Sequence, residues 1–343
     1  MRSPPIAILG TGLVTSVGLT AAACCCAFRA KITNPFETRF IDSSGAWIMA
    51  HQVSLDRPWF GLTKLAKMAA LAIEEALQDL NRNQWHQLPL LLCVAETERP
   101  GRMAGLDDQL LTMIQNELGV SFAPPSAVVP HGRVAVAVAL SQARTLLASS
   151  KIPGLLIVSA DSLLSWPTLS HYERDDRLLT ESNSNGFMPG EGAGALWVGA
   201  ADSRSTQLLC IGIGFGREAA HIGSGEPLRA DGLTQAIKAS LDDAGRQLTD
   251  MDFRITDNSG EQYYFKEASL ALTRTLRQPK EFFDIWHPAE CTGETGAASG
   301  VAVIATAREA CVKGYALGRN ILSHWANDAG QRAAVTLEYG VAA

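Results

Sequence analysis

Cys291 is the residue of this chain whose type and position best suit nucleophilic chemistry. It lies just before a stretch of small residues, Gly296–Cys311, that predicts a buried helix. A thiol at the N-terminus of a helix loses its proton more easily, and the first amides of the helix can hold an oxyanion. Glu294 follows three residues later, and its carboxylate would raise the thiol pKa and oppose this activation. The residues therefore favour a buried, unreactive thiol, with a nucleophilic Cys291 as the alternative.

A second stretch of mostly Ala, Val and Leu, Gly132–Ala148, predicts another buried helix. Two residues at its start bear on chemistry. His131 could act as a base or a ligand, although Pro130 precedes it and no partner is identifiable. Arg133 cannot serve as a nucleophile, because a guanidinium of pKa above about 12 keeps its proton. The remaining histidines and carboxylates show no metal-binding spacing, so we expect no metal.

Glycines are densest between Asn185 and Gly199, where they surround one acid, Glu191. Glycines this close together allow tight turns and close approach of the backbone. The apolar run Ala195–Val198 follows and predicts a strand buried on both faces. We therefore expect a glycine turn that leads into a core strand. Glu191 is then a structural acid bonded to backbone amides, with a catalytic role as the less favoured alternative.

Residues Gly186–Gly194 resemble the Gly-Phe-x-x-Gly-Glu-Gly-Ala-Gly segment of the β-ketoacyl-acyl-carrier-protein synthases, which are condensing enzymes of the thiolase superfamily. The opening residues Ile8–Gly18 are similar to the first strand and loop of the same family. The resemblance implies a thiolase-like α/β fold of two similar halves, each a mixed sheet with helices, in five layers, α-β-α-β-α. It also implies a homodimer, with the strand Ala127–Val129 near the interface.

The same resemblance implies a Cys-His-His catalytic set, and the matching positions of this chain hold other residues. The nucleophile position, at the start of the first buried helix, falls on Arg133. The first histidine would lie in the stretch that begins at Thr256, which has no histidine. The second histidine corresponds to Glu294. We therefore expect no catalytic residues, and we expect Arg133 and Glu294 to lie together at the starts of the two buried helices as an ion pair.

Further positions also depart from the family pattern. A small shift in the alignment moves the nucleophile position to Val129, His131 or Gly132, and none of these is cysteine or serine. Ala289 stands where the family has a lysine, and Trp325–Gly330 replaces a glycine-rich loop. Departures at all these positions together indicate that condensing activity is lost.

The resemblance implies two kinds of function. The favoured one is a binding, scaffold or accessory subunit, because degenerate chains resembling this family occur as chain-length partners and near bacterial type VI secretion effectors. Its implied partners are a second copy of the chain, another protein or an acyl-carrier protein. The alternative is an active acyltransferase, a 3-oxoacyl-acyl-carrier-protein synthase, that uses a reassigned site.

Strands and helices alternate along the chain in two similar series, which predicts parallel strands with helices outside them. Gly61–Thr63 and Gly232–Thr234 each open an amphipathic helix, and Ala302–Arg308 matches Val138–Arg144 at the same distance after a glycine. These repeats predict an N-terminal half over 1–200 and a C-terminal half over 201–343. In the N-terminal half we expect a turn at Gly10–Gly12, helices over Leu62–Leu80 and Gly101–Leu118, and a polar excursion over Ser165–Ser184.

Composition limits the partners. The 343 residues are 47% hydrophobic and 19% charged, which is typical of a globular protein with a large core. A net charge of −6 without a basic block argues against nucleic acid or an anionic membrane surface as partner. No apolar run reaches about 20 residues, so we expect no transmembrane helix. The seven cysteines lack a Cys-x-x-Cys pair and indicate free thiols in the cytoplasm. Gly10–Gly12 lacks the third glycine of a dinucleotide fingerprint, so we expect no cofactor.

Overall fold

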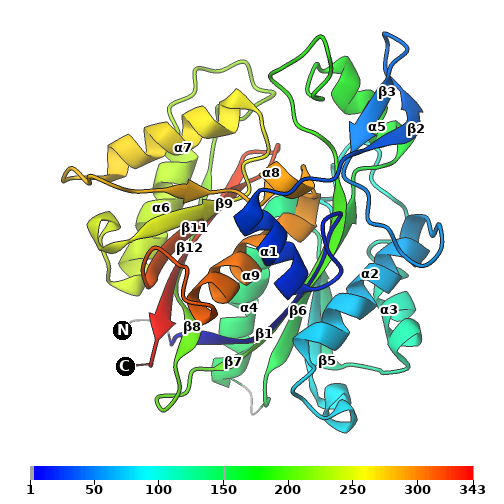
Figure 1. Cartoon of the computed structure of the whole chain (residues 1–343). Helices are drawn as coiled ribbons and strands as arrows, with labels where there is room; N and C mark the ends of the chain where they lie inside the picture. The colour runs from blue at the N-terminus through cyan, green and yellow to red at the C-terminus, as the bar shows by residue number, and fades with distance from the viewer. Residues whose placement is uncertain (1–3, 150–151, 343) are drawn as a thin grey trace.

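The computed structural model describes residues 4–149 and 152–342 and has a mixed α/β fold (Figure 1). Ten strands form one mixed sheet, and two more form a separate hairpin. The N-terminal half supplies β1 (Ile6–Val14), the hairpin strands β2 (Phe36–Ile41) and β3 (Trp47–Ala50), β4 (Pro89–Cys93), β5 (Ala123–Val129), β6 (Leu155–Ser162) and β7 (Glu191–Ala200). The C-terminal half supplies β8 (Gln207–Arg217), β9 (Phe253–Thr256), β10 (Ile285–Trp286), β11 (Asn320–Ala326) and β12 (Gln331–Gly340).

The two halves of the chain repeat one topology. Across the sheet the order is β10-β9-β11-β12-β8-β1-β7-β6-β4-β5, so the second half mirrors the strand order of the first. In each half the last strand runs antiparallel to both of its neighbours, and the other pairs are parallel. The first strands, β1 and β8, pair with each other in the middle, with Ile6 opposite Cys210. The predicted two similar halves are confirmed, while a domain boundary at 200/201, between β7 and β8, stays a prediction.

Two helices lie at the centre of the molecule, against strands of both halves, and each begins with a 3₁₀ turn (Figure 1). The turn Gly132–Val134 leads into α4 (Ala135–Ser149), and the turn Gly296–Ala298 leads into α9 (Ser299–Val312). Both helices contact strands of both halves and each other. The first turns of α4 and most of α9, including all of Ser299–Ala307, are buried. The sequence prediction of two buried small-residue helices, packed together near the centre of the molecule, is therefore confirmed.

The other helices lie outside these two. α2 packs on β1 and β7, and α6 packs on β8 and β12, so they cover the faces of the sheet opposite the central helices. With the central pair, these layers give the predicted order α-β-α-β-α. The remaining described helices are α1 (Ala21–Ala30), α2 (Gly61–Ala76), α3 (Leu110–Leu118), α5 (Trp166–Arg174), α6 (Asp231–Ala244), α7 (Gln262–Thr275) and α8 (Ala289–Thr292), with 3₁₀ turns at Arg82–Gln87 and Leu248–Asp250.

Of two glycine-rich stretches that the sequence predicts as turns, one lies inside a strand and the other becomes a strand from Glu191 onward. Gly10–Gly12 lies inside β1, where a Cβ at Gly12 would come within 1.9 Å of the Ala72 carbonyl oxygen. Likewise Glu191 to Gly194 lie inside β7, where a Cβ at Gly194 would come within 2.4 Å of Val301. Glycine here serves close packing of helices α2 and α9 onto the strands rather than chain reversal.

Other boundaries also differ from the sequence predictions. α2 ends at Ala76 rather than Leu80, because the chain closes in tighter turns from Leu77 onward. α3 covers only the second half of the predicted Gly101–Leu118 helix, since Gly101 and Gly105 have positive φ angles of 70° and 85°. The polar excursion over Ser165–Ser184 contains one short helix, α5, as expected. The hairpin of β2 and β3, and the strand β11, have no counterpart among the predictions.

The sheet ends at β5, which hydrogen-bonds to β4 and leaves its other edge without a strand among the described residues. Ala127–Val129, the strand expected near a dimer interface, lies at this edge, and two prolines, Pro124 and Pro125, occupy its first part. The homodimer itself stays a prediction. None of the helices in the described ranges has the length and apolar character needed to cross a membrane.

Candidate functional site

The starts of the two central helices come together around one buried arginine. Gly132 and Gly296 precede the helices with positive φ angles of 55° and 57°. A Cβ on Gly132 would come within 2.0 Å of a Glu96 oxygen, and one on Gly296 within 2.1 Å of an Asp161 oxygen. Arg99 bridges these two carboxylates, with Nη1 2.7 Å from Asp161 and Nη2 2.7 Å from Glu96. The two helices therefore begin with the same glycine conformation, and both starts lie beside the Arg99 guanidinium.

Arg133 and Glu294 form the ion pair that the sequence predicts. The Arg133 Nη1 donates to Glu294 Oε2 at 2.9 Å, and both side chains are buried. Glu294 also accepts a hydrogen bond from the Ser259 hydroxyl at 2.8 Å and one from the Gly296 amide at 2.9 Å. The carboxylate thus caps the start of the second central helix while it neutralises an arginine at the start of the first.

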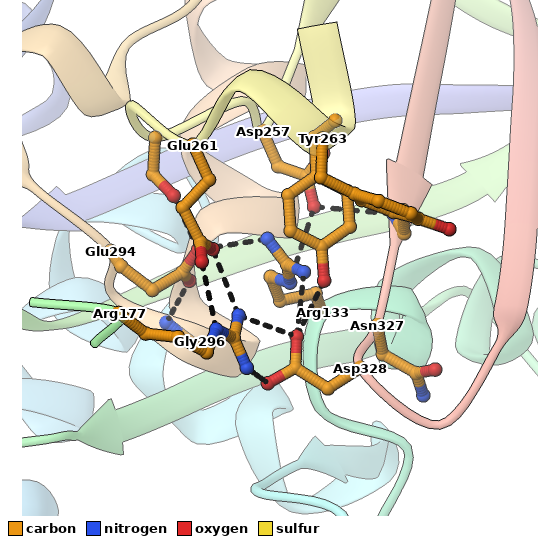
Figure 2. Close-up of polar contacts among 12 residues, drawn as sticks. Arg133, Arg177, Asp257, Glu261, Tyr263, Glu294, Gly296, Asn327 and Asp328 are labelled. Atoms are coloured by element: carbon orange, nitrogen blue, oxygen red, sulfur yellow. Dashed lines mark hydrogen bonds and ion pairs between the residues drawn. The ribbon is translucent and has the colours of Figure 1, made fainter. Parts of the chain in front are cut away.

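Asp328, in the turn between β11 and β12, connects this pair to a second arginine (Figure 2). Its Oδ2 accepts from Arg177 Nη1 at 2.7 Å, and its Oδ1 accepts from Arg133 Nη2 at 3.3 Å and from the Tyr264 hydroxyl at 2.5 Å. The Tyr172 hydroxyl donates to Oδ2 at 3.2 Å. Burial alone would raise the pKa of Asp328, but Arg177 and Arg133 hold that pKa well below its ordinary value. Asp328 is therefore ionised and shared by both arginines.

Two more carboxylates complete the group. Arg177 forms a bidentate ion pair with Glu261, with Nε–Oε1 and Nη2–Oε2 distances of 2.7 and 2.8 Å. Asp257 Oδ2 lies 3.7 Å from Arg133 Nε and accepts from the Ala326 amide at 3.3 Å. Burial raises the pKa of Asp257 to about 7, against the lowering effect of Arg133. We call Arg133, Arg177, Asp257, Glu261, Glu294 and Asp328 the ion cluster.

Aromatic rings and neighbouring side chains close the ion cluster. The Arg133 guanidinium carbon lies 4.3 Å from the centre of the Tyr264 ring. Burial opposes the charge of Arg133, but the Tyr264 oxygen and the carboxylates of Glu294, Asp257 and Asp328 hold its pKa well above the ordinary value. The cavity left among Arg99, Arg133, Arg177 and the side chains around them measures about 10 Å³. That is no more room than one water molecule needs.

The other predicted site residues lie outside the ion cluster. Cys291 is in α8, where its sulfur lies 4.0 Å from the Ala27 carbonyl of α1, and burial raises its pKa to about 11. His131 is half-buried, and its Nδ1 lies 3.4 Å from Gln331 Oε1. Thr256 is buried at the end of β9, and its hydroxyl has no hydrogen-bond partner among the described residues. The structure thus brings Arg133 and Glu294 together and places Cys291 outside their cluster, with a thiol pKa that burial raises.

Glu191 has the surroundings expected of a structural acid. It is buried and forms an ion pair with Lys64. Its Oε1 accepts from the Val53 amide at 3.0 Å, and its Oε2 accepts from the Ser162 hydroxyl at 3.0 Å. These bonds connect β7 to α2, to the end of β6 and to the segment after β3.

Three residues of this site, Arg177, Tyr264 and Asp328, are not predicted from the sequence. Arg177 lies in the polar excursion after α5, and Asp328 lies in the stretch Trp325–Gly330, which replaces a glycine-rich loop of the family. The sequence signal for Arg177 and Asp328 is one arginine and one aspartate in loops that follow buried elements. That pattern is too common to identify them as members of a site.

Comparison with known proteins supports the fold. No family model and no curated protein matches the chain. Among solved structures, the ishigamide ketosynthase/chain length factor has a TM-score of 0.78 at 19% identity, over 99% of this chain and 100% of that one. A ketosynthase in complex with its chain length factor from Xenorhabdus doucetiae has a TM-score of 0.75 at 12% identity, over 98% of each chain. A β-ketoacyl synthase from Burkholderia phymatum has a TM-score of 0.73 at 14% identity, over 99% and 100%. The chain therefore has the thiolase-like fold of the ketosynthases.

Proposed function

We propose that this protein is a ketosynthase-like chain that has lost condensing activity and acts as a binding, scaffold or accessory subunit. The observation that carries the proposal is the position of Arg133. It stands at the start of the first central helix, where the family resemblance puts the nucleophile, and it is held there by Glu294, Asp328 and Asp257.

The chemistry of the ion cluster supports this proposal. A guanidinium whose pKa is held above its ordinary value has no free electron pair with which to attack a thioester. Glu294 accepts three hydrogen bonds, from Arg133, Ser259 and Gly296, so its oxygens are already occupied. A cavity of about 10 Å³ cannot admit an acyl chain unless the cluster opens.

The partner we propose is another protein. The solved structures of similar fold include a ketosynthase with its chain length factor and a ketosynthase with its acyl-carrier protein, so such chains form assemblies. We propose that the present chain forms a homodimer or pairs with a related subunit in the cytoplasm of a bacterium, within an acyl-assembly or secretion system.

Acyl labelling tests the loss of activity. Purified protein is incubated with acyl-coenzyme A and with acyl-acyl-carrier protein, and its intact mass is measured, with an active ketosynthase as the positive control. Because no described residue of the ion cluster is a thiol, we expect no covalent adduct. The same reaction with Cys291→Ala and Ser259→Ala serves to place any adduct that forms.

An adduct that disappears in Cys291→Ala, and that neutral hydroxylamine removes, would overturn the proposal in favour of an acyltransferase with a reassigned thiol. An adduct that disappears only in Ser259→Ala would also overturn it, because Ser259 donates to Glu294 inside the former active-site region.

A further inference from the structure

A second cavity lies on the side of α1, away from the ion cluster, and shares no lining residue with it. Its volume is about 630 Å³, and its walls come from the C-terminal part of α1, from β10 and the residues beside it, and from the loop after α9. Pockets that hold small molecules are typically about 300–1,000 Å³ and mostly apolar. We call this cavity the aromatic pocket.

Aromatic rings form the walls of the aromatic pocket. Phe28 on α1 is buried, and Trp286 on β10 faces Tyr315 with ring centres 6.4 Å apart and planes 24° from parallel. On its other side Trp286 packs against Phe253 of the core, at 4.6 Å between ring centres. The Trp286 ring is therefore fixed by the core while it remains half-buried toward the cavity. Such walls suit a flat apolar body.

One cation at the mouth of the aromatic pocket has no carboxylate partner among the described residues. Lys31 is 3.4 Å from Glu290, so this pair is neutral. Arg29, by contrast, lies with its guanidinium carbon 4.6 Å from the centre of the Tyr315 ring. In the part of the chain that the structure describes, its guanidinium forms no ion pair and no hydrogen bond. A guanidinium held against a ring can bind an anionic group without first breaking another ion pair.

Asp284 adds an anion to the wall of the aromatic pocket. Asp284 is exposed, lines both the aromatic pocket and a neighbouring hollow that contains Lys280 and Phe282, and has no ion pair among the described residues. Its charge would repel an anionic ligand, so Arg29 and Asp284 should act in opposite directions on the affinity. Cys25, also in the wall, is buried and burial raises the pKa of its thiol, so binding here would be non-covalent.

We propose that the aromatic pocket binds a small molecule with an aromatic or other flat apolar body and one anionic group. The body lies against Phe28, Trp286 and Tyr315, and the anion contacts Arg29. This proposal does not depend on the loss of condensing activity, because the pocket and the ion cluster have no residue in common.

Two probes with the same body test the proposal. 1-Anilinonaphthalene-8-sulfonate carries an anion, and N-phenyl-1-naphthylamine lacks it, and both report binding by fluorescence. We expect Arg29→Gln to lower the affinity for the sulfonate probe about tenfold, which is the change that one lost charge-assisted contact causes. The affinity for the neutral probe should not change. Asp284→Asn should raise the affinity for the sulfonate probe, and Tyr315→Ser should lower the affinity for both probes.

Arg39→Gln is the matched control. Arg39 is also an exposed arginine over aromatic rings, 5.2 Å from the centres of both Phe40 and Phe60, and it lines a smaller cavity of about 280 Å³. Its variant should leave both affinities unchanged. Equal sulfonate affinity in the wild type and Arg29→Gln would overturn the proposal, and so would a loss that appears in Arg39→Gln instead.

Discussion

The ion cluster and the aromatic pocket differ in what fills them. The ion cluster brings two arginines and four carboxylates to the starts of the central helices and leaves about 10 Å³ of space. The aromatic pocket has about 630 Å³ of space, a wall of rings and one arginine, Arg29, that forms no ion pair with any described residue. In the ion cluster, where the family resemblance puts the condensing site, side chains hold the two central helices together. In the aromatic pocket, where space is open, the one described thiol in the wall, Cys25, is buried. The comparison indicates that arginines in the two regions serve stability and binding, respectively.

Replacing the arginine of each region should separate these roles most strongly. Arg133→Ala strands the carboxylates of Glu294 and Asp257 in a buried site, so we expect it to lower the free energy of unfolding by about 3–5 kcal/mol. Arg29→Gln removes an exposed charge with no ion pair, so its effect should stay within about 0.5 kcal/mol. Urea denaturation of both variants beside the wild type measures the difference.

Glu294→Gln provides the converse of Arg133→Ala, because it leaves the arginine without its closest carboxylate. The double variant Arg133→Ala with Glu294→Gln should lose less stability than the two single losses added together. If the losses in free energy of unfolding add up, or if Arg133→Ala loses less than about 1 kcal/mol, the ion cluster does not stabilise the packing of the two central helices.

A glycine substitution tests the helix starts themselves. Gly296→Ala combines a φ of 57° with a Cβ 2.1 Å from Asp161 Oδ2. Gly314→Ala, at φ 72°, meets no atom within 4 Å and isolates the backbone effect. We expect the free energy of unfolding to fall by about 2–4 kcal/mol in Gly296→Ala and by about 1–2 kcal/mol in Gly314→Ala. Equal melting temperatures of the two variants would show that the Asp161 carboxylate moves away from the added Cβ at no cost in stability.

The smallest expected effect depends on pH. Since the pKa of Asp257 is about 7 in the folded protein and near 3.8 when exposed, the folded state binds more protons between these values. Stability must then fall as pH rises from about 4 to 7, and remain level above that. Asp257→Asn removes this dependence, so its stability relative to the wild type should rise by about 1–3 kcal/mol between pH 5 and 8.

Asp107→Asn is the control for this pH series. The hydrogen bond from Arg102 lowers the pKa of Asp107, so that group changes stability only in the acid range. Between pH 5 and 8 its variant should follow the wild type. A wild-type stability that increases across this range, with Asp257→Asn parallel to it, would place the Asp257 pKa below 5.

Much of the fold follows from the sequence, because its decisive signals are local. The small-residue compositions of Gly132–Ala148 and Gly296–Cys311 predict two helices that pack closely, and the structure has both. The pairing of Arg133 with Glu294 follows from their places at the two helix starts. The strand β11 escapes prediction because two of its buried residues, Ser323 and His324, are polar and break the apolar pattern.

The remaining members of the ion cluster could not be predicted because loops bring them in. Arg177 reaches Asp328 across 151 positions of the chain, and Asp328 lies in a turn whose direction depends on the pairing of β11 with β12. The glycines of β1 and β7 misled the prediction for the opposite reason. Dense glycine favours turns, but here the close approach of α2 and α9 requires it.

The central place of β1 affects how the chain folds during synthesis. β1 leaves the ribosome well before its two neighbours in the sheet, β7 and β8, which begin only at Glu191 and Gln207. At ordinary rates of translation this interval is on the order of 10–40 s. During that time neither edge of β1 has its native partner, although Ile6, Ile8 and Leu13 are fully apolar core residues. During this interval the nascent chain carries an unpaired hydrophobic strand, which favours binding by chaperones until β7 and β8 pair with it.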